Sequence, residues 1–453
     1  MPPIHLPPDI LHGIALWIED ASTLFVFLEA LGVLRGPLDP LYQLGLSSPD
    51  RQSFFWPRLR LDRLPSRTKW EPIGQFYSHI VVSGQADIVR LRRHLPPTVH
   101  LEWVDIPLQH AAVDLSLAAW YADWAELRLT KVSGNSWHVV QHWRVCLTPI
   151  LAVLPRLAHL VSLDLTGAMC LESIFDFAAT SPTLIDLKLE PHREYFDWGS
   201  PRGAPGGLTS LSTAILASLL KWFDHQHPRS LELMSVTFAT DQAVDDDVFA
   251  TIRDRLCSVM LTCPTLDFLS IWRFDVPHLS LLDDAMPVAV AALELIEVRA
   301  KAMCQLAHGF VGSTRVQSLT LRELRDDCDF ELVFQALLSS KVKHLLLRGC
   351  FVAQWPPLVP VLKLLALETL EMREMNLGDD VVRFIARGLQ GNATLRHLNF
   401  ESNDITIEGA LPLLQHAPAT IDTIVLTGNL LNAANVANLH AAASERGMTL
   451  KFN

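Results

Sequence analysis

The second half of the chain repeats a short pattern: Leu, two residues, Leu, one residue, another apolar residue, and Asn or Cys three residues later. Alternate side chains of a strand face opposite ways, so the second and third apolar residues of the pattern enter a core while their neighbours face solvent. The Asn or Cys then ends the strand and can satisfy backbone groups of the adjacent turn. Each copy therefore predicts one strand, and the clearest copies are Leu395, Leu398, Phe400 and Asn403, then Ile421, Ile424, Leu426 and Asn429, and also Val342, Leu345, Leu347 and Cys350.

One period of this pattern covers about 25 to 28 residues, which lies within the range of leucine-rich repeats. The register continues toward the N-terminus as apolar pairs, with less regular spacing before Leu269. With a last strand at Leu450 and Phe452, it predicts about fifteen coils. The pairs are Leu370 and Met372, Leu319 and Leu321, Ile296 and Val298, Leu269 and Ile271, Leu231 and Leu233, Leu187 and Leu189, Leu163 and Leu165, Leu127 and Leu129, Leu101 and Trp103, Ile80 and Val82, and Leu59 and Leu61.

Between the last strands, Asp379 to Leu389 and Glu408 to Gln415 carry apolar residues at helical spacing. Acidic residues at the start of the first segment suit the N-terminus of a helix. This unit of strand, turn and helix resembles the ribonuclease-inhibitor type of repeat. We therefore expect an α/β leucine-rich repeat solenoid over residues 59–453, a single curved horseshoe of parallel strands inside and helices outside, in which each coil contacts only its neighbours.

Two stretches interrupt the rhythm. Pro191 to Ser210 is rich in Pro and Gly and contains three aromatic residues. Lys131 to Pro149 holds Trp137, His138, His142 and Trp143. Both are predicted to be loops inserted between coils, and two interpretations stay open: excursions without a role, or binding elements.

Composition narrows the choice of partners and compartment. The formal net charge of −12 argues against a generic nucleic-acid binder, which would carry a basic patch. Seven cysteines without a Cys-x-x-Cys motif suit a reducing compartment. The first residues lack the basic start of a signal peptide, and no apolar stretch is expected to be long enough to span a bilayer. We expect a cytoplasmic or nuclear protein without a nucleic-acid or membrane partner.

The sequence gives little support for a catalytic, metal or cofactor site. Gly309 to Ser313 contains Gly-x-x-Gly-Ser but lacks the Lys of a phosphate-binding loop. His138 and His142 lie four residues apart, yet Val139 stands where a metalloprotease needs Glu. The nearest cysteine pair, Cys257 and Cys263, suits a core better than a metal site. We expect no enzyme activity, no catalytic residue, no metal and no cofactor.

Residues 1–58 form a separate head before the first coil. They open with Leu6-Pro7-Pro8-Asp9-Ile10-Leu11, continue with apolar residues at helical spacing, and end near Trp56-Pro57-Arg58-Leu59. This order resembles an F-box. In that family the region is a small helical bundle that docks onto a Skp-type adaptor and links a bound substrate to a cullin-type ubiquitin ligase. The resemblance implies that the adaptor contacts are Leu6, Pro7, Ile10, Leu11 and Ile14.

The head also departs from that family, because Gly36-Pro37 and Pro40 stand where the family usually continues as helix. The alternative for the head is a cap that covers the apolar edge of the first coil, a feature that solenoids require.

The strand period also predicts which residues face the concave side. The seventh position of four consecutive repeats is arginine, with Trp272 before the row and Glu401 after it. Strands stack about 4.8 Å apart, so the row would be roughly 14 Å long. It either binds an acidic or phosphorylated segment of a partner or is neutralised by Glu297, Glu323, Glu371 and Glu374. The four arginines are Arg299, Arg322, Arg348 and Arg373.

Three functions follow from these features. The first is an F-box substrate receptor whose repeat array holds an unknown protein substrate. The second is a repeat scaffold or inhibitor of the ribonuclease-inhibitor kind, in which the head is only a cap. The third, a GTPase-activating protein of the Ran type, usually carries an acidic tail, whereas this sequence ends at Asn453 after a strand. The first is favoured.

Overall fold

The computed structural model describes residues 7–65, 68–107, 109–110, 115–134, 145–146, 148–168, 171–191, 209–234, 236–237, 246–272, 287–298, 300–324 and 328–452. The chain divides into two compact units, Met1–Leu187 and Lys188–Asn453. Four sequence predictions lie outside the described residues: Leu6, Arg299, the interior of the segment predicted as a loop from Pro191 to Ser210, and the histidine pair His138 and His142.

Parallel strands in sequence order dominate both units, and the described residues hold fifteen of them. The first unit contains β1 (Leu59–Arg60), β2 (His79–Ser83), β3 (His100–Val104), β5 (Leu129–Gly134) and β7 (Ser162–Ala168), and β8 (Asp186–Pro191) spans the boundary. The second unit contains β10 (Ser230–Leu233), β12 (Phe268–Trp272), β13 (Ala292–Ile296), β14 (Ser318–Arg322), β15 (His344–Arg348), β16 (Thr369–Arg373), β17 (His397–Asn399), β18 (Thr423–Val425) and β19 (Thr449–Lys451).

Helices alternate with these strands. In the first unit they are α1 (Pro8–Trp17), α2 (Ala21–Leu31), η1 (Gly32–Leu38), α3 (Asp39–Ser47), η2 (Pro49–Arg51), α4 (Gln52–Phe55), η3 (Leu61–Arg63), α5 (Glu71–Gly74), α6 (Ile88–His94), α7 (Leu115–Trp124), α8 (Thr148–Val153), η4 (Leu154–Arg156) and α9 (Leu171–Thr180), where η marks a 3-10 helix. In the second they are α10 (Thr213–His225), α11 (Asp246–Thr262), α12 (Ala300–Phe310), α13 (Phe330–Leu337), η6 (Pro356–Leu358), α14 (Val359–Leu362), α15 (Asp379–Leu389), α16 (Ile407–His416) and α17 (Ala433–Glu445).

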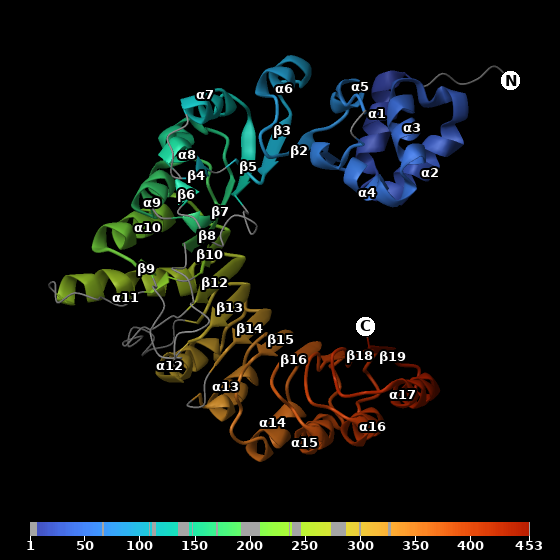
Figure 1. The fold of residues 1–453 in the computed structure, drawn as a ribbon. Coiled ribbons are helices and arrows are strands. Elements are labelled where there is room, and N and C mark those ends of the chain that lie inside the picture. The colour runs from blue at the N-terminus through green and yellow to red at the C-terminus, as the bar shows by residue number, and fades with distance from the viewer. Residues whose placement is uncertain are drawn as a thin grey trace. The chain divides into compact units, whose positions relative to one another are not determined.

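Within the second unit, helices α12 to α17 follow one side of the strands (Figure 1). The helices predicted at residues 379–389 and 408–415 are confirmed as α15 and α16. Two small ladders also occur, β4 (Gln109–His110) antiparallel to β6 (Val145–Cys146), and β9 (Thr209–Ser210) parallel to β11 (Val236–Thr237).

The alternation of the repeat is the physical reason for this fold. Leu319 and Leu321 of β14 pair in register with Leu345 and Leu347 of β15, and all four side chains are buried. Burying one such side chain contributes about 1.5–3 kcal/mol. The residues between them stay half-exposed on the other face. Parallel strands in sequence order with intervening helices confirm the α/β leucine-rich repeat fold.

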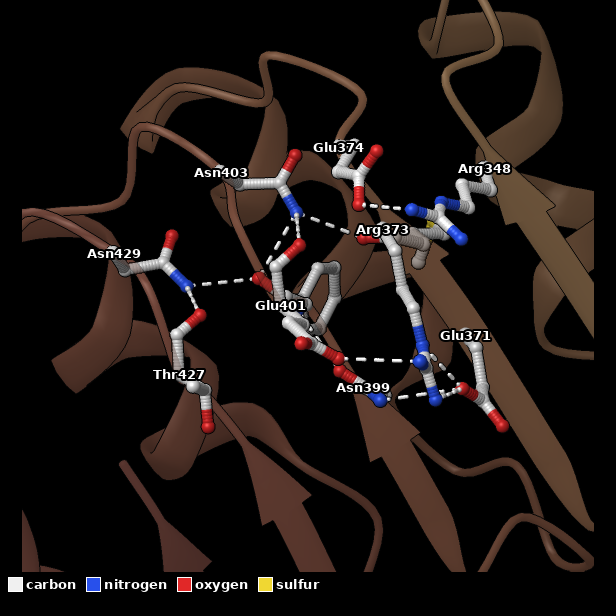
Figure 2. A network of polar contacts seen from close by, with 11 residues as sticks. Arg348, Glu371, Arg373, Glu374, Asn399, Glu401, Asn403, Thr427 and Asn429 are labelled. Atoms are coloured by element: carbon white, nitrogen blue, oxygen red, sulfur yellow. Dashed lines mark hydrogen bonds and ion pairs between the residues drawn. The ribbon is translucent and has the colours of Figure 1, made fainter. Parts of the chain in front are cut away.

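Asn403 lies in the turn after β17 and satisfies backbone groups there, as the sequence predicts (Figure 2). Its Oδ1 accepts hydrogen bonds from the amides of Met375 at 3.0 Å and Leu377 at 3.1 Å. Its Nδ2 donates to the carbonyls of Met372 at 2.8 Å and Phe400 at 2.9 Å. One buried amide therefore satisfies backbone groups of two consecutive coils.

Asn429 and Cys350 occupy the equivalent place in their own repeats. Asn429 accepts from the amide of Ile405 at 3.1 Å and donates to the carbonyl of Phe400 at 2.8 Å. The thiol of Cys350 donates to the carbonyl of Leu321 at 3.3 Å. Burial raises the pKa of this thiol to about 11, so it stays a neutral donor.

The predicted register is wrong in one coil of the second unit. The sequence predicts Ile296 and Val298 as the inward pair, but Leu293 and Leu295 occupy those places, opposite Leu319 and Leu321. Ile296 is therefore the partner of Arg322 on the next strand. The following turn confirms this alignment, because the next residue has a left-handed φ in four consecutive coils: Glu297 at 52°, Glu323 at 56°, Gly349 at 60° and Glu374 at 54°.

A second register error falls in β5. Leu127 and Leu129 were the predicted inward pair, but Leu129 pairs with Leu101 and Val132 with Trp103. A register shift between the two pairs adds a residue to β5, which a strict two-residue alternation does not anticipate. The interruption predicted from Lys131 also begins later, because β5 continues to Gly134.

The expectation that no apolar stretch reaches the length of a membrane span is also wrong for the described residues. Ala21–Ser47 is long and apolar enough by length and composition alone. It is not one straight helix, because Gly32 at the start of η1 and Gly36 within η1 have φ of 55° and 52°. Its buried side chains, which include Leu24, Phe25, Leu28, Leu38, Leu41 and Leu44, form the interior of the head.

Candidate functional site

Helix α1 of the head presents two apolar faces. Leu11 and Ala15, four residues apart, are buried inside the head. Ile10, Ile14 and Trp17, spaced by four and three residues, are 50%, 38% and 88% exposed. Residues at this spacing share one side of a helix. The exposed set is therefore a continuous apolar stripe, here named the α1 stripe.

The head is also attached to the first coil by polar and aromatic contacts. The hydroxyl of Tyr77 donates to the carbonyl of Phe55 at 2.5 Å, and the imidazole of His12 hydrogen-bonds the carbonyl of Phe76 at 3.0 Å. The rings of Trp56 and Tyr77 lie 5.6 Å apart. These contacts place the head against the residues that precede β2, as a cap requires.

The adaptor residues implied by the F-box resemblance fall into different environments. Pro7, Ile10 and Ile14 are exposed. Leu11 faces the interior of the head and does not lie on the α1 stripe. Trp17 does lie there but was missed from the sequence, although its distance of seven residues from Ile10 is a helical spacing that could have revealed it.

The arginine column of the second unit is shorter than predicted. In the coil where Arg299 was expected, Ile296 occupies the column, and it is buried. Trp272, which is half-buried, occupies the same column on the preceding strand, β12, and pairs in register with Ile296. Three arginines, Arg322, Arg348 and Arg373, do occupy successive positions.

Each of these three arginines has a carboxylate partner. Arg322 pairs with Glu294 at 3.2 Å, a residue that the sequence did not identify as its partner. Arg348 pairs with Glu374 at 2.8 Å, as the neutralisation alternative anticipated.

Arg373 bridges two carboxylates, as Figure 2 shows. It donates to Glu371 through Nε at 2.7 Å and pairs with Glu401 at 3.2 Å. Asn399 donates to the same carboxylate of Glu371 at 3.2 Å. The column is thus a network of ion pairs on the exposed face of the strands, in which each of the three guanidinium groups already has a carboxylate partner.

The network pairs each positive charge with a negative one, but it contributes little to the free energy of unfolding. The hydrogen bond that Arg348 donates to Glu374 is the main reason that the pKa of Arg348 is raised above its usual value. Part-exposed ion pairs contribute only about 0–1 kcal/mol each. An acidic segment would have to displace these carboxylates, which weakens the prediction that this column binds one.

His397 begins β17 on the same face and predicts a pH dependence. Burial lowers its pKa below the ordinary value of 6.5, and Lys451 and Arg373 lower it further against the opposing effect of Glu371. Just below pH 6.5 the unfolded chain therefore binds protons more readily than the folded chain. The free energy of unfolding rises with pH in that window, and stability is lost as the pH falls.

Replacing His397 by Gln, which does not titrate, should flatten this slope between about pH 5.5 and about pH 7.5. Urea denaturation of the wild type and the variant at both pH values measures the difference. An unchanged slope in the variant would show that other groups carry the pH dependence.

The part of the chain that the structure describes contains no candidate metal centre. No group of three or more His, Cys, Asp or Glu side chains there could hold a metal ion. Cys257 is fully buried in α11, and burial raises the pKa of its thiol.

No protein-family description matches the sequence, and no curated protein matches it. Among solved structures, one similar chain is described as "Crystal structure of mouse RP105/MD-1 complex", with 15% sequence identity and a TM-score of 0.42. The alignment covers 82% of this chain and 63% of that chain, so this chain spans less than two thirds of its length. The order and register of the strands themselves therefore carry the assignment of this protein to the leucine-rich repeat fold.

Proposed function

We propose that this protein is the substrate-binding subunit of a cullin-type ubiquitin ligase. The head docks onto a Skp-type adaptor through the α1 stripe, and the repeat array binds a protein substrate. The observation that supports the docking role is the exposure of Ile10, Ile14 and Trp17 on one side of a helix whose other side builds the head.

Exposed apolar side chains at helical spacing suit a helix that enters a partner's groove. Transfer of one such side chain from water to an interface contributes about 1.5–3 kcal/mol, and tryptophan is among the residues that most often dominate binding. Further exposed apolar residues of the head, Val26 and Leu46, lie on α2 and α3. The head thus exposes several apolar side chains that do not belong to its own core.

The cap alternative uses a different part of the head. The contacts of Tyr77, His12 and Trp56 attach it to the first coil without the α1 stripe. A head that served only as a cap would leave Trp17 in water without a role. Both roles fit in one head, and only the docking role needs the stripe.

The test is a double substitution, Ile10→Asp with Trp17→Asp, measured by titration calorimetry of the intact protein with a Skp-type adaptor. Placing charge in an apolar contact should weaken binding by about 100-fold or more. Val33→Asp is the matched control, because Val33 is 96% exposed on η1 of the same head, and it should leave the affinity unchanged.

Two results would overturn the proposal. One is absence of adaptor binding by the folded wild type, which would leave a repeat scaffold or inhibitor with a capped end. The other is an equal loss in the double variant and in Val33→Asp, which would show that binding does not depend on the α1 stripe.

A further inference from the structure

A short row of cationic side chains crosses the strands of the first unit. His79 begins β2 and pairs in register with His100, which begins β3. Their imidazole rings stack, with centroids 5.0 Å apart and 22° between the ring planes. The amide of Leu101 donates to the carbonyl of Arg128 at 3.0 Å, which places Arg128 beside His100. Neighbouring strands lie about 4.8 Å apart, so these side chains are close enough to contact one small ligand.

Arg128 differs from the arginines of the second unit in its partners. Its Nε is buried and has no hydrogen-bond partner among the described residues. Buried polar groups in folded proteins almost always have a partner, and an unsatisfied one indicates a water, an ion or a ligand that completes it. The Nε of Arg322 is likewise buried without a hydrogen-bond partner, but its guanidinium pairs with Glu294, whereas Arg128 has no ion pair among the described residues.

A carboxylate on the same face, that of Glu102, is already paired. Glu102 lies two residues after His100 on β3, so both side chains face the same way. Glu102 pairs with Lys131 at 2.9 Å and with Arg58 at 3.3 Å. It is therefore not available to neutralise the row.

The surroundings of His100 show the same excess of positive charge. Burial is the main reason that its pKa is lowered, and the charges of Arg128, His79 and His159 lower it further. His159 is exposed in the turn that precedes β7. The charged groups that shift the pKa of His100 are therefore all basic, and with His100 they come from four consecutive coils.

We propose that the row of His79, His100 and Arg128 binds a phosphate group, with His159 at the edge of the site. A guanidinium offers paired donors that match phosphate oxygens, and imidazoles add further donors on the neighbouring strands. A dianion matches several cations better than a single carboxylate does. The site lies on β2, β3 and the residues before β5, so it is independent of adaptor docking by α1.

The test follows the histidine ring protons of the intact protein by NMR while inorganic phosphate is added at constant ionic strength. His79→Gln and His100→Gln identify the two resonances. Both resonances should shift in a saturable way, and sodium chloride at the same ionic strength should not reproduce the shift. A phosphoserine peptide and its unphosphorylated form make up the second arm, and tighter binding of the phosphopeptide than of inorganic phosphate would identify a phosphorylated protein segment as the source.

The decisive variant is Arg128→Gln, which should weaken phosphate binding by about tenfold or more. Arg396→Gln is the matched control, because Arg396 is an exposed arginine that is paired with Asp422, and it should leave the titration unchanged. Arg128→Lys keeps a charge at the position if the Gln variant does not fold, and it should bind phosphate more weakly than the wild type. Absence of a saturable shift, equal binding by Arg128→Gln and the wild type, or equal response to acetate would overturn the proposal.

Discussion

Replacing Asn403 by Ala should lower the free energy of unfolding of the second unit by about 3–5 kcal/mol. The side chain is only 4% exposed, and its amide holds two backbone N–H groups and two carbonyls of consecutive coils. The methyl group of Ala offers none of these bonds, so the buried donors and acceptors would stay unsatisfied. Urea denaturation followed by circular dichroism measures the loss.

Asn438 provides the control for that substitution. It is exposed on α17, and Asn438→Ala should change stability by less than about 0.5 kcal/mol. A comparable loss in both variants, or a loss below about 1 kcal/mol for Asn403→Ala, would show that water replaces the side chain and that Asn403 does not hold the coils together.

Replacing Trp103 by Ala should cost the first unit about 3–5 kcal/mol, because the substitution opens a large cavity. Trp103 of β3 is fully buried, its ring lies 5.5 Å from that of Trp120 and 6.1 Å from that of Trp124, and its N–H donates to the carbonyl of Gly84 at 3.0 Å. Thermal unfolding monitored by tryptophan fluorescence reports the loss.

Trp17→Ala is the matched control, since Trp17 is exposed on α1. This variant should unfold at nearly the wild-type temperature because it removes little buried surface. If the two tryptophan variants lost equal stability, Trp103 would not be the centre of the first unit's core.

The repeat pattern predicted most strands because leucine occupies both inward positions and polar residues separate them. The pattern failed at β13 because this segment contains two apolar pairs with the required spacing. Leu293 and Leu295 would face one side of the strand, and Ile296 and Val298 would face the other side. A strand that shifts by an odd number of residues turns its other face to the core. Only pairing with β14 separates the two choices, and a single repeat does not contain that information.

Another recurring feature was missed because it lies outside the strand pattern. Just before several strands, Ser313, Ser340 and Asn392 accept hydrogen bonds from backbone amides and donate to carbonyls of the same or the preceding coil. A Ser or Asn two or three residues before the first apolar position was the available signal. It is short and common, so it has little weight before the repeats are aligned.

The arginine partners could not be predicted from sequence spacing. Long side chains choose among several carboxylates on a sheet face, and small differences in direction decide the pairing. Arg322 pairs with Glu294 of the preceding strand, whereas Arg348 pairs with Glu374 of the following coil. The head differs from the arginine column in this respect. Ile10 and Ile14 were predicted as surface contacts from a family resemblance, and both are exposed in the structure.

The most direct measurement of the proposed docking is hydrogen–deuterium exchange of the intact protein with and without a Skp-type adaptor. The account predicts slower exchange in peptides from α1 and α2, residues 8–31, while peptides from the strands β12 to β19 exchange as in the free protein. Slower exchange confined to the repeat strands, or no change in any peptide at saturating adaptor, would contradict it.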